Sequence, residues 1–147
     1  MNIDPEIDQR IRSSFARMQT MATFGASLRA VRKGEVEILL PFSGALVQQH
    51  GFIHAGVLAT IADTACGYAA LTLMPGDAAV LTTEFKINLL SPAKGERFVA
   101  LGRVVRPGRK LMVCLGEVFA EEDEVRKQVA LMTASMIAVE GATGLRD

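Results

Sequence analysis

The chain has 147 residues, half of them hydrophobic, which is enough for one domain to bury a core without metals or disulfides. Its 16 lysines and arginines balance its 16 aspartates and glutamates, and no basic stripe with interleaved aromatic residues is present, so we expect no nucleic-acid partner. Cys66 and Cys114 both lie in apolar runs, and the first residues contain no apolar signal segment. These features predict a cytoplasmic protein with free, buried thiols.

The first residues predict an amphipathic helix within residues 1–22. Asp4 followed by Pro5 is a typical N-cap and first-turn pair. Apolar side chains then recur at spacings of four, four and three residues, which places them on one face of a helix. These side chains are Ile7, Ile11, Phe15 and Met18.

The rest of the chain predicts two strands, one long helix and then a run of strands. Residues 51–74 are rich in Ala, Leu and Thr and end at Pro75 and Gly76, so most of this segment is expected to be one buried helix. In residues 83–89 apolar and polar side chains alternate, as in a half-buried strand. The other predicted strands cover residues 27–31, 35–40, 98–105, 111–119 and 125–139. A helix this poor in charge needs cover on most sides, which indicates an α+β fold with an antiparallel sheet wrapped around it.

Asp63 is the one charged residue between Gly51 and Gly76. A buried carboxylate without a partner is costly to desolvate, so its presence requires a cavity or a partner. Catalysis is one explanation, and a structural acid bonded to backbone amides or paired with an arginine such as Arg103 is the other. A membrane-spanning helix is disfavoured, because Asp63 falls near its centre and glycines and threonines interrupt the apolar run.

Residues 42–139 resemble the hotdog-fold acyl-CoA thioesterases, particularly the phenylacetate-pathway, or PaaI-like, type. The resemblance is carried by Gln48, Gly51, His54, Gly56, Asp63 nine residues after the histidine, and the segment TTEFKINLLSPA. It implies a hotdog fold, in which the sheet wraps the central helix, as a single domain over residues 23–147 after the N-terminal helix. It also implies a homodimer or a dimer of dimers, with active sites where two protomers meet. One departure is that the family's usual His-Gly-Gly is His54-Ala55-Gly56 here.

The resemblance implies a catalytic role for Asp63 as general base or nucleophile, facing Gln48, His54 and Ala55 of the other protomer. Gln48 would hold the attacking water or the carbonyl, His54 would shape the helix entry, and the backbone amide of Ala55 would bind the oxyanion. The chemistry of thioester hydrolysis agrees with these roles. A thiol with a pKa of about 8.5 leaves without help from a strong general acid, so one carboxylate suffices for catalysis. Unpaired amides at a helix start also suit a developing oxyanion. Because that donor is main-chain, a methyl group at Ala55 affects the space for the acyl group more than the mechanism.

Candidate substrate-binding residues follow from helical spacing and from the resemblance. The Asp63 face of the helix carries small residues, which indicates either a ligand slot or close packing against the sheet. These residues are Gly56, Ala59, Thr60, Gly67 and Ala70. Thr82 or Thr83 is implied to line the acyl end. The positive charges around one turn suit the phosphates of coenzyme A, although a solvated hairpin tip explains them equally well. These charges include Arg103, Arg106 and Arg109.

Other kinds of site are poorly supported by the sequence. His50 and His54 lack a third ligand nearby, so no metal is expected, and no cofactor is expected beyond the coenzyme A of the substrate. Ser43 is not in a nucleophile elbow, and Cys66 has no histidine within a helical turn. The sequence therefore predicts hydrolysis of acyl-CoA to free acid and coenzyme A. The alternatives are a non-catalytic acyl-CoA-binding hotdog protein or, less well supported, a hotdog dehydratase.

Overall fold

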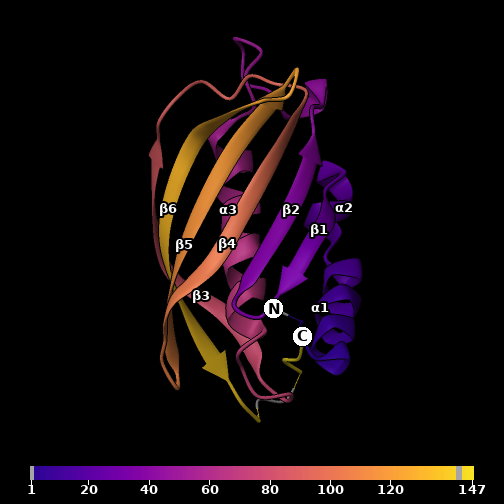
Figure 1. The fold of residues 1–147 in the computed structure, drawn as a ribbon, viewed down its shortest axis with the longest axis vertical. Coiled ribbons are helices and arrows are strands. Elements are labelled where there is room, and N and C mark those ends of the chain that lie inside the picture. The colour runs from indigo at the N-terminus through magenta and orange to yellow at the C-terminus, as the bar shows by residue number, and fades with distance from the viewer. Residues whose placement is uncertain (1, 142–143) are drawn as a thin grey trace.

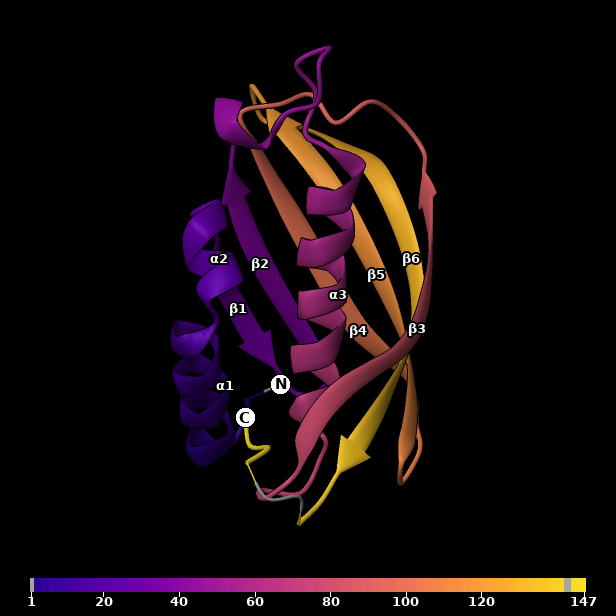
Figure 2. The same ribbon diagram turned by 180° about the vertical axis from the view of Figure 1, so that it is seen from behind.

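Six antiparallel strands form one sheet that wraps around a single long helix (Figure 1 and Figure 2). The computed structural model describes residues 2–141 and 144–147. The strands are β1 (Ser27–Arg32), β2 (Glu35–Pro41), β3 (Ala79–Leu89), β4 (Arg97–Pro107), β5 (Leu111–Glu122) and β6 (Val125–Val139). They lie in the order β1-β2-β4-β5-β6-β3, and α3 (Ala55–Leu71) runs along one face of the sheet. The predicted α+β fold is confirmed.

The helix α3 lies close to the sheet because two glycines face it. Gly102 of β4 and Gly116 of β5 are direct neighbours in the strand register. A Cβ atom on Gly102 would overlap the backbone of Ala65 and Cys66, and a Cβ atom on Gly116 would lie 3.0 Å from the Cys66 sulfur. Glycine in a strand interior often marks such a close approach of another backbone. The contact fixes the position of α3, and with it that of Asp63, relative to the sheet.

The N-terminal segment forms two helices, α1 (Pro5–Arg17) and α2 (Gln19–Phe24), rather than the one helix predicted within residues 1–22. Asp4 caps α1, as predicted, by accepting a hydrogen bond from the Glu6 amide at 2.8 Å. Met18 then has an extended backbone, with ψ of 99°, which separates the two helices. Ile11 and Met21 are fully buried in the core, so both helices are held by packing beside β1 (Figure 2). A short 3₁₀ helix, η1 (Gly44–Leu46), follows β2.

The strand β3 lies at one edge of the sheet and is longer than predicted, since it begins at Ala79 rather than residue 83. Its expected half-burial is incomplete within one chain. Phe85 and Leu89 are 47% and 53% exposed, although both pair with buried alanines of β6. The reason is that, within the described residues, β3 is an edge strand with β6 on one side alone, while α3 packs most closely against β4. The edge therefore presents apolar side chains that one chain leaves uncovered.

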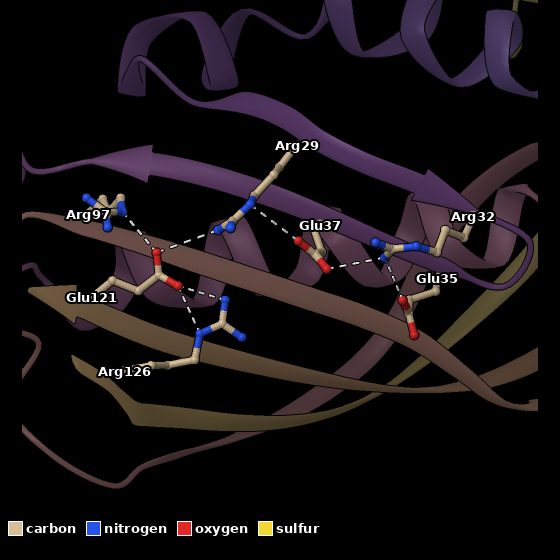
Figure 3. A network of polar contacts seen from close by, with 7 residues as sticks. All are labelled: Arg29, Arg32, Glu35, Glu37, Arg97, Glu121 and Arg126. Atoms are coloured by element: carbon tan, nitrogen blue, oxygen red, sulfur yellow. Dashed lines mark hydrogen bonds and ion pairs between the residues drawn. The ribbon is translucent and has the colours of Figure 1, made fainter. Parts of the chain in front are cut away.

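A network of charged side chains ties the strands together on the face of the sheet that points away from α3 (Figure 3). Glu121 is its nearly buried centre and accepts hydrogen bonds from Arg97 and Arg126, both at 2.9 Å. Burial raises the pKa of Glu121, but the hydrogen bonds from Arg126 and Arg97 outweigh it and hold the pKa below its ordinary value. The other members are Arg29, Arg32, Glu35 and Glu37. The network joins the end of β5 to β1, β2 and β4.

Candidate active site

Asp63 lies in the middle of α3 with its carboxylate turned towards β3. Its Oδ1 atom accepts a hydrogen bond from the Thr82 hydroxyl at 2.7 Å. Burial raises the pKa of Asp63, and the hydrogen bond from Thr82 offsets part of this shift. Arg103 is not a partner, because Gly102 faces α3 and the next side chain along the strand points to the opposite face of the sheet. The alternative explanation of Asp63 as the partner of Arg103 is therefore wrong.

A cavity of ≈ 130 Å³ lies beside the Asp63 carboxylate. Gly67 is open to it, since a Cβ atom there would meet nothing within 4 Å. Gly56 and Thr60 do not line the cavity; the Thr60 hydroxyl donates instead to the Gly56 carbonyl within the helix, at 2.8 Å. The other residues of the wall are Met18, Thr64, Tyr68, Val80, Thr82 and Asp147. Of the five small residues predicted to line a slot, Gly67 alone lines this cavity.

The β3 residue beside the carboxylate is Thr82 and not Thr83. The Thr83 hydroxyl donates to the Ser135 carbonyl at 3.1 Å and does not line the cavity. A bulge between Thr82 and Glu84 shifts the pairing with β6, so that Thr82 lies opposite the buried Met136. Because a bulge changes which side chains face the core, it turns Thr82 towards α3.

His54 caps α3 and leaves one backbone amide free. Its Nδ1 atom accepts a hydrogen bond from the Gly56 amide at 2.8 Å, which places the proton of the neutral ring on Nε2. The amides of Val57 and Leu58 donate to the His54 carbonyl. Within the described residues the Ala55 amide has no acceptor. Of the four amides that a helix start leaves unpaired, that of Ala55 is thus the one without an acceptor in the described residues.

Gln48 organises the loop before α3 and points a donor outward. Its side-chain oxygen accepts hydrogen bonds from the amides of His50 at 2.7 Å and Phe52 at 3.1 Å. Gly51, with φ of 87°, makes the turn between them at no steric cost. Since the oxygen is occupied, the side-chain NH₂ group is left to donate. Gln48 can therefore hold a carbonyl or water oxygen.

Gln48 and Ala55 share a second concavity, of ≈ 390 Å³, which Asp63 does not reach. This concavity is also lined by Leu58, by Leu89 at the end of β3 and by the segment that follows, which begins with Leu90. Ala55 and Asp63 are eight positions apart, which is about 12 Å along a helix. The carboxylate of Asp63 and the free amide with Gln48 therefore lie in two separate concavities of one chain.

The predicted phosphate-binding arginines are exposed and lie towards the β4–β5 hairpin. Arg103 and Arg106 pair with Leu115 and Val113, so a bulge between Val104 and Arg106 places both on the face away from α3. Arg109 lies in the hairpin, where with Lys110 it borders a concavity of ≈ 620 Å³. Neither the cavity at Asp63 nor the concavity at Gln48 contains any of the three arginines.

The comparison with known families identifies the class of protein. The model of the thioesterase superfamily matches residues 50–127, from the loop before α3 to the start of β6. The chain belongs to the thioesterase superfamily.

Solved structures support this assignment to the thioesterase superfamily. A thioesterase family protein from Silicibacter pomeroyi is 49% identical, with 92% of this chain and 99% of that chain covered and a TM-score of 0.90. The PaaI protein from the phenylacetic acid degradation operon of E. coli is 19% identical over 96% of this chain and 99% of its own, with a TM-score of 0.83. These likenesses confirm the predicted hotdog fold and the PaaI-like resemblance.

Curated relatives of this thioesterase-superfamily chain are similar over a shorter range. A protein of Halobacterium salinarum, named as an inferred esterase, is 31% identical over 93 residues, which is 60% of this chain and 61% of that protein. The chain thus spans less than two thirds of the length of the curated relatives that it matches. The names of these relatives, esterase and thioesterase family protein, agree with the superfamily that the family model gives for this chain.

The thioesterase-superfamily chain offers little for other chemistries. Burial raises the pKa of the Cys66 thiol and raises that of Cys114 to about 11, so neither provides a thiolate. Ser43 caps η1 by accepting a hydrogen bond from the Ala45 amide. Within residues 2–141 and 144–147, no group of three or more His, Cys, Asp or Glu side chains is placed to hold a metal ion. None of the helices in the described residues is long and apolar enough to cross a membrane.

Sequence reasoning missed five residues that line the cavity beside Asp63: Met18, Thr64, Tyr68, Val80 and Asp147. Tyr68 carried a usable signal, because it is the one tyrosine of the chain and lies five positions after Asp63 on an apolar helix. Met18 continues the spacing of apolar residues along α1, so the sequence did not indicate that it lies at the break between two helices. Asp147 gave no local signal, since it reaches the cavity through a contact with residues distant in sequence.

Proposed function

We propose that the protein hydrolyses acyl-CoA thioesters to the free acid and coenzyme A. The observation that carries the proposal is the partly buried Asp63 carboxylate, which is oriented by Thr82 at 2.7 Å and faces a cavity. Burial raises its pKa, which brings a carboxylate closer to the range in which it acts as a general base. The free Ala55 amide and the donor group of Gln48 supply the second half of such a site.

In the proposed reaction Asp63 takes a proton from water while the water oxygen attacks the thioester carbonyl. The Ala55 amide stabilises the oxyanion, and the NH₂ group of Gln48 holds the carbonyl or the water. The carbon–sulfur bond then breaks, and coenzyme A leaves as a thiolate that takes up the proton. The same carboxylate also suits direct attack, which gives an acyl-aspartyl anhydride that water opens. Both routes require Asp63.

We propose that two copies of the chain assemble the site, as a homodimer or a dimer of dimers. In the described residues β3 pairs on one side alone, with β6, and its apolar side chains Phe85 and Leu89 are half exposed. A long apolar edge strand is a template for pairing with another chain. Antiparallel pairing of β3 about a two-fold axis reverses the partner's α3, which brings the partner's helix start towards Asp63. Two half-sites of different chains then complete each other.

We further propose that Arg103, Arg106 and Arg109 bind the phosphates of coenzyme A. All three are exposed, and they form no ion pair within the described part of the chain. The hairpin between β4 and β5, which carries Arg109, lies at the end of the sheet where α3 ends (Figure 1). In the reversed pairing this end lies near the partner's helix start, where the thioester would lie.

The direct test is the release of free thiol from a panel of aromatic and aliphatic acyl-CoAs, followed with a thiol reagent. Repeated turnover on at least one thioester supports the proposal. Saturable binding of acyl-CoAs without thiol release would instead identify a non-catalytic binding protein. Hydration of an enoyl-CoA without thiol release would identify a dehydratase.

Thr82→Val is expected to move the acid limb of the pH profile of kcat/KM to higher pH. The hydrogen bond from Thr82 stabilises the carboxylate and lowers the pKa of Asp63, so its loss raises that pKa further. A smaller fraction of Asp63 is then ionised at each acidic pH. Thr83→Val is the matched control, since its hydroxyl bonds the Ser135 carbonyl. If the acid limb of the kcat/KM profile lay at the same pH in Thr82→Val and Thr83→Val, the proposed role of Thr82 would be contradicted.

Gly67→Ala is expected to stabilise the fold while impairing hydrolysis. Alanine favours a helix over glycine by about 1 kcal/mol, and the added Cβ meets nothing within 4 Å. The same methyl group takes up space in the cavity beside Asp63, so kcat/KM should fall most for the bulkiest acyl groups. Thermal unfolding and the acyl-CoA panel measure the two effects. Unchanged selectivity in a stabilised variant would mean that the acyl group does not enter this cavity.

A further inference from the structure

The wall of the cavity beside Asp63 includes Asp147, a residue from the segment that follows β6. Its Oδ2 atom accepts a hydrogen bond from the Val80 amide at 2.6 Å. Its Oδ1 atom accepts one from the Ser14 hydroxyl at 3.4 Å, and Ser14 in turn bonds the Tyr68 hydroxyl at 3.0 Å. Asp147 is thus held by β3 and α1, and is linked through Ser14 to Tyr68 of α3. The two views of the fold show this end of the chain beside α1 (Figure 1 and Figure 2).

The directions of these hydrogen bonds follow from the number of protons available. A carboxylate only accepts, so the one Ser14 proton goes to Asp147. Tyr68 must then donate to Ser14. The chain Tyr68 to Ser14 to Asp147 therefore has a single arrangement, and all its protons are used within the wall. A ligand that displaced Asp147 would leave the Val80 amide, and one hydroxyl proton of the Ser14–Tyr68 pair, without an acceptor, which is costly in a partly buried place.

The volume of the cavity indicates what fits in front of this wall. The cavity measures ≈ 130 Å³, and an apolar protein cavity of about 150 Å³ holds a single benzene molecule. One ring or a short aliphatic chain therefore fills the space. A longer chain reaches Asp147 and must push it aside.

We propose that Asp147 sets the length limit of the acyl group and restricts the enzyme to compact acyl-CoAs. The inference rests on the proposed function, because it takes the cavity beside Asp63 as the acyl site. Asp147 contacts the far end of the acyl group and acts through its volume and its hydrogen bonds. Its charge is secondary, since an asparagine oxygen can accept the same bond from the Val80 amide.

The test compares kcat/KM for a straight-chain series from acetyl-CoA to dodecanoyl-CoA in wild type, Asp147→Ala and Asp147→Asn. Asp147→Ala removes the wall and is expected to raise the ratio of long-chain to short-chain kcat/KM by about tenfold or more, the size of discrimination that small differences in a pocket produce. Asp147→Asn keeps the shape of the wall and is expected to keep a ratio close to that of wild type. Arg146→Ala, an exposed neighbour on the same segment, controls for disturbance of the segment itself.

An unchanged ratio in Asp147→Ala, with turnover of the short acyl-CoAs, would overturn the length limit and leave the proposed hydrolysis standing. An equal rise in Arg146→Ala would also overturn it, because the effect would then belong to the segment. No turnover of any acyl-CoA by the wild type would overturn the proposed function itself. Melting curves of all four proteins verify that the ratios are compared between folded enzymes.

Discussion

Asp63→Asn is expected to lower kcat for thioester hydrolysis by about 10²- to 10⁴-fold, the range in which a positioned general base contributes. Asparagine has nearly the same shape as aspartate, and its side-chain oxygen can still accept the hydrogen bond from Thr82 that is 2.7 Å long in the native protein. The variant lacks the charge that removes a proton from water or attacks the carbonyl. The measurement is kcat and KM by thiol release, and KM should change much less than kcat if the acyl group still binds.

The stability of this variant separates loss of chemistry from loss of structure. Burial raises the pKa of Asp63 above its value in the unfolded chain, so the folded protein binds this proton more tightly. The free energy of unfolding therefore falls as pH rises from the unfolded pKa, about 3.9, to the raised value, and the whole penalty is present above it. Asp63→Asn removes the penalty. It should melt no lower than wild type at neutral pH.

The matched control is Asp77→Asn, the same change at an exposed loop residue, which should retain full activity. Activity that survives in Asp63→Asn would mean that another residue carries the reaction. If Asp63→Asn instead melts well below wild type, Asp63 is a structural acid. A loss of activity in that variant would then reflect loss of the fold and not loss of a catalytic group.

The parts of the site that were predictable from the sequence depend on local signals. Asp63 is conspicuous because its apolar segment contains no other charge, and His54 lies where a buried helix must begin. The choice between Thr82 and Thr83 was not predictable. Strict alternation from Phe85 places Thr83 on the core side, whereas the bulge between Thr82 and Glu84 moves Thr82 to that side. A bulge depends on the partner strand, and one strand read alone does not show it.

The remaining differences arise from contacts between segments far apart in the sequence. Met18 continues the apolar spacing of α1, yet the chain breaks there because Ile11 and Met21 both pack into the core from separate helices. Asp147 accepts a hydrogen bond from the amide of Val80, which lies 67 positions earlier in the chain. The spacing of apolar and polar residues within one segment does not predict such a contact. Tertiary packing overrides local preference in both places.

Gly102→Ala is expected to lower the free energy of unfolding by about 3 kcal/mol or more, at the upper end of the cost of overpacking a core. The added Cβ would overlap the Ala65 carbonyl group and the Cys66 nitrogen. These atoms belong to the hydrogen-bonded backbone of α3, so no side-chain rotation relieves the overlap, and the helix must move off the sheet. A domain with about 5–15 kcal/mol of stability should then melt about 10 °C lower.

Two other glycine substitutions make this expectation specific. Gly116→Ala, in the neighbouring strand, meets the Cys66 sulfur at 3.0 Å and the Met132 Cβ at 3.4 Å, and these side chains have more freedom to move, so its loss should be smaller. Gly67→Ala, within α3 itself, should stabilise. Urea unfolding of the three variants gives the order. Equal losses of unfolding free energy in Gly102→Ala and Gly116→Ala would contradict direct packing of α3 on the backbone of β4.

The Gly102→Ala substitution should also affect hydrolysis. Because Ala65 follows Asp63 by two positions, a helix displaced by Gly102→Ala should separate Asp63 from Thr82 and reduce hydrolysis in the protein that remains folded.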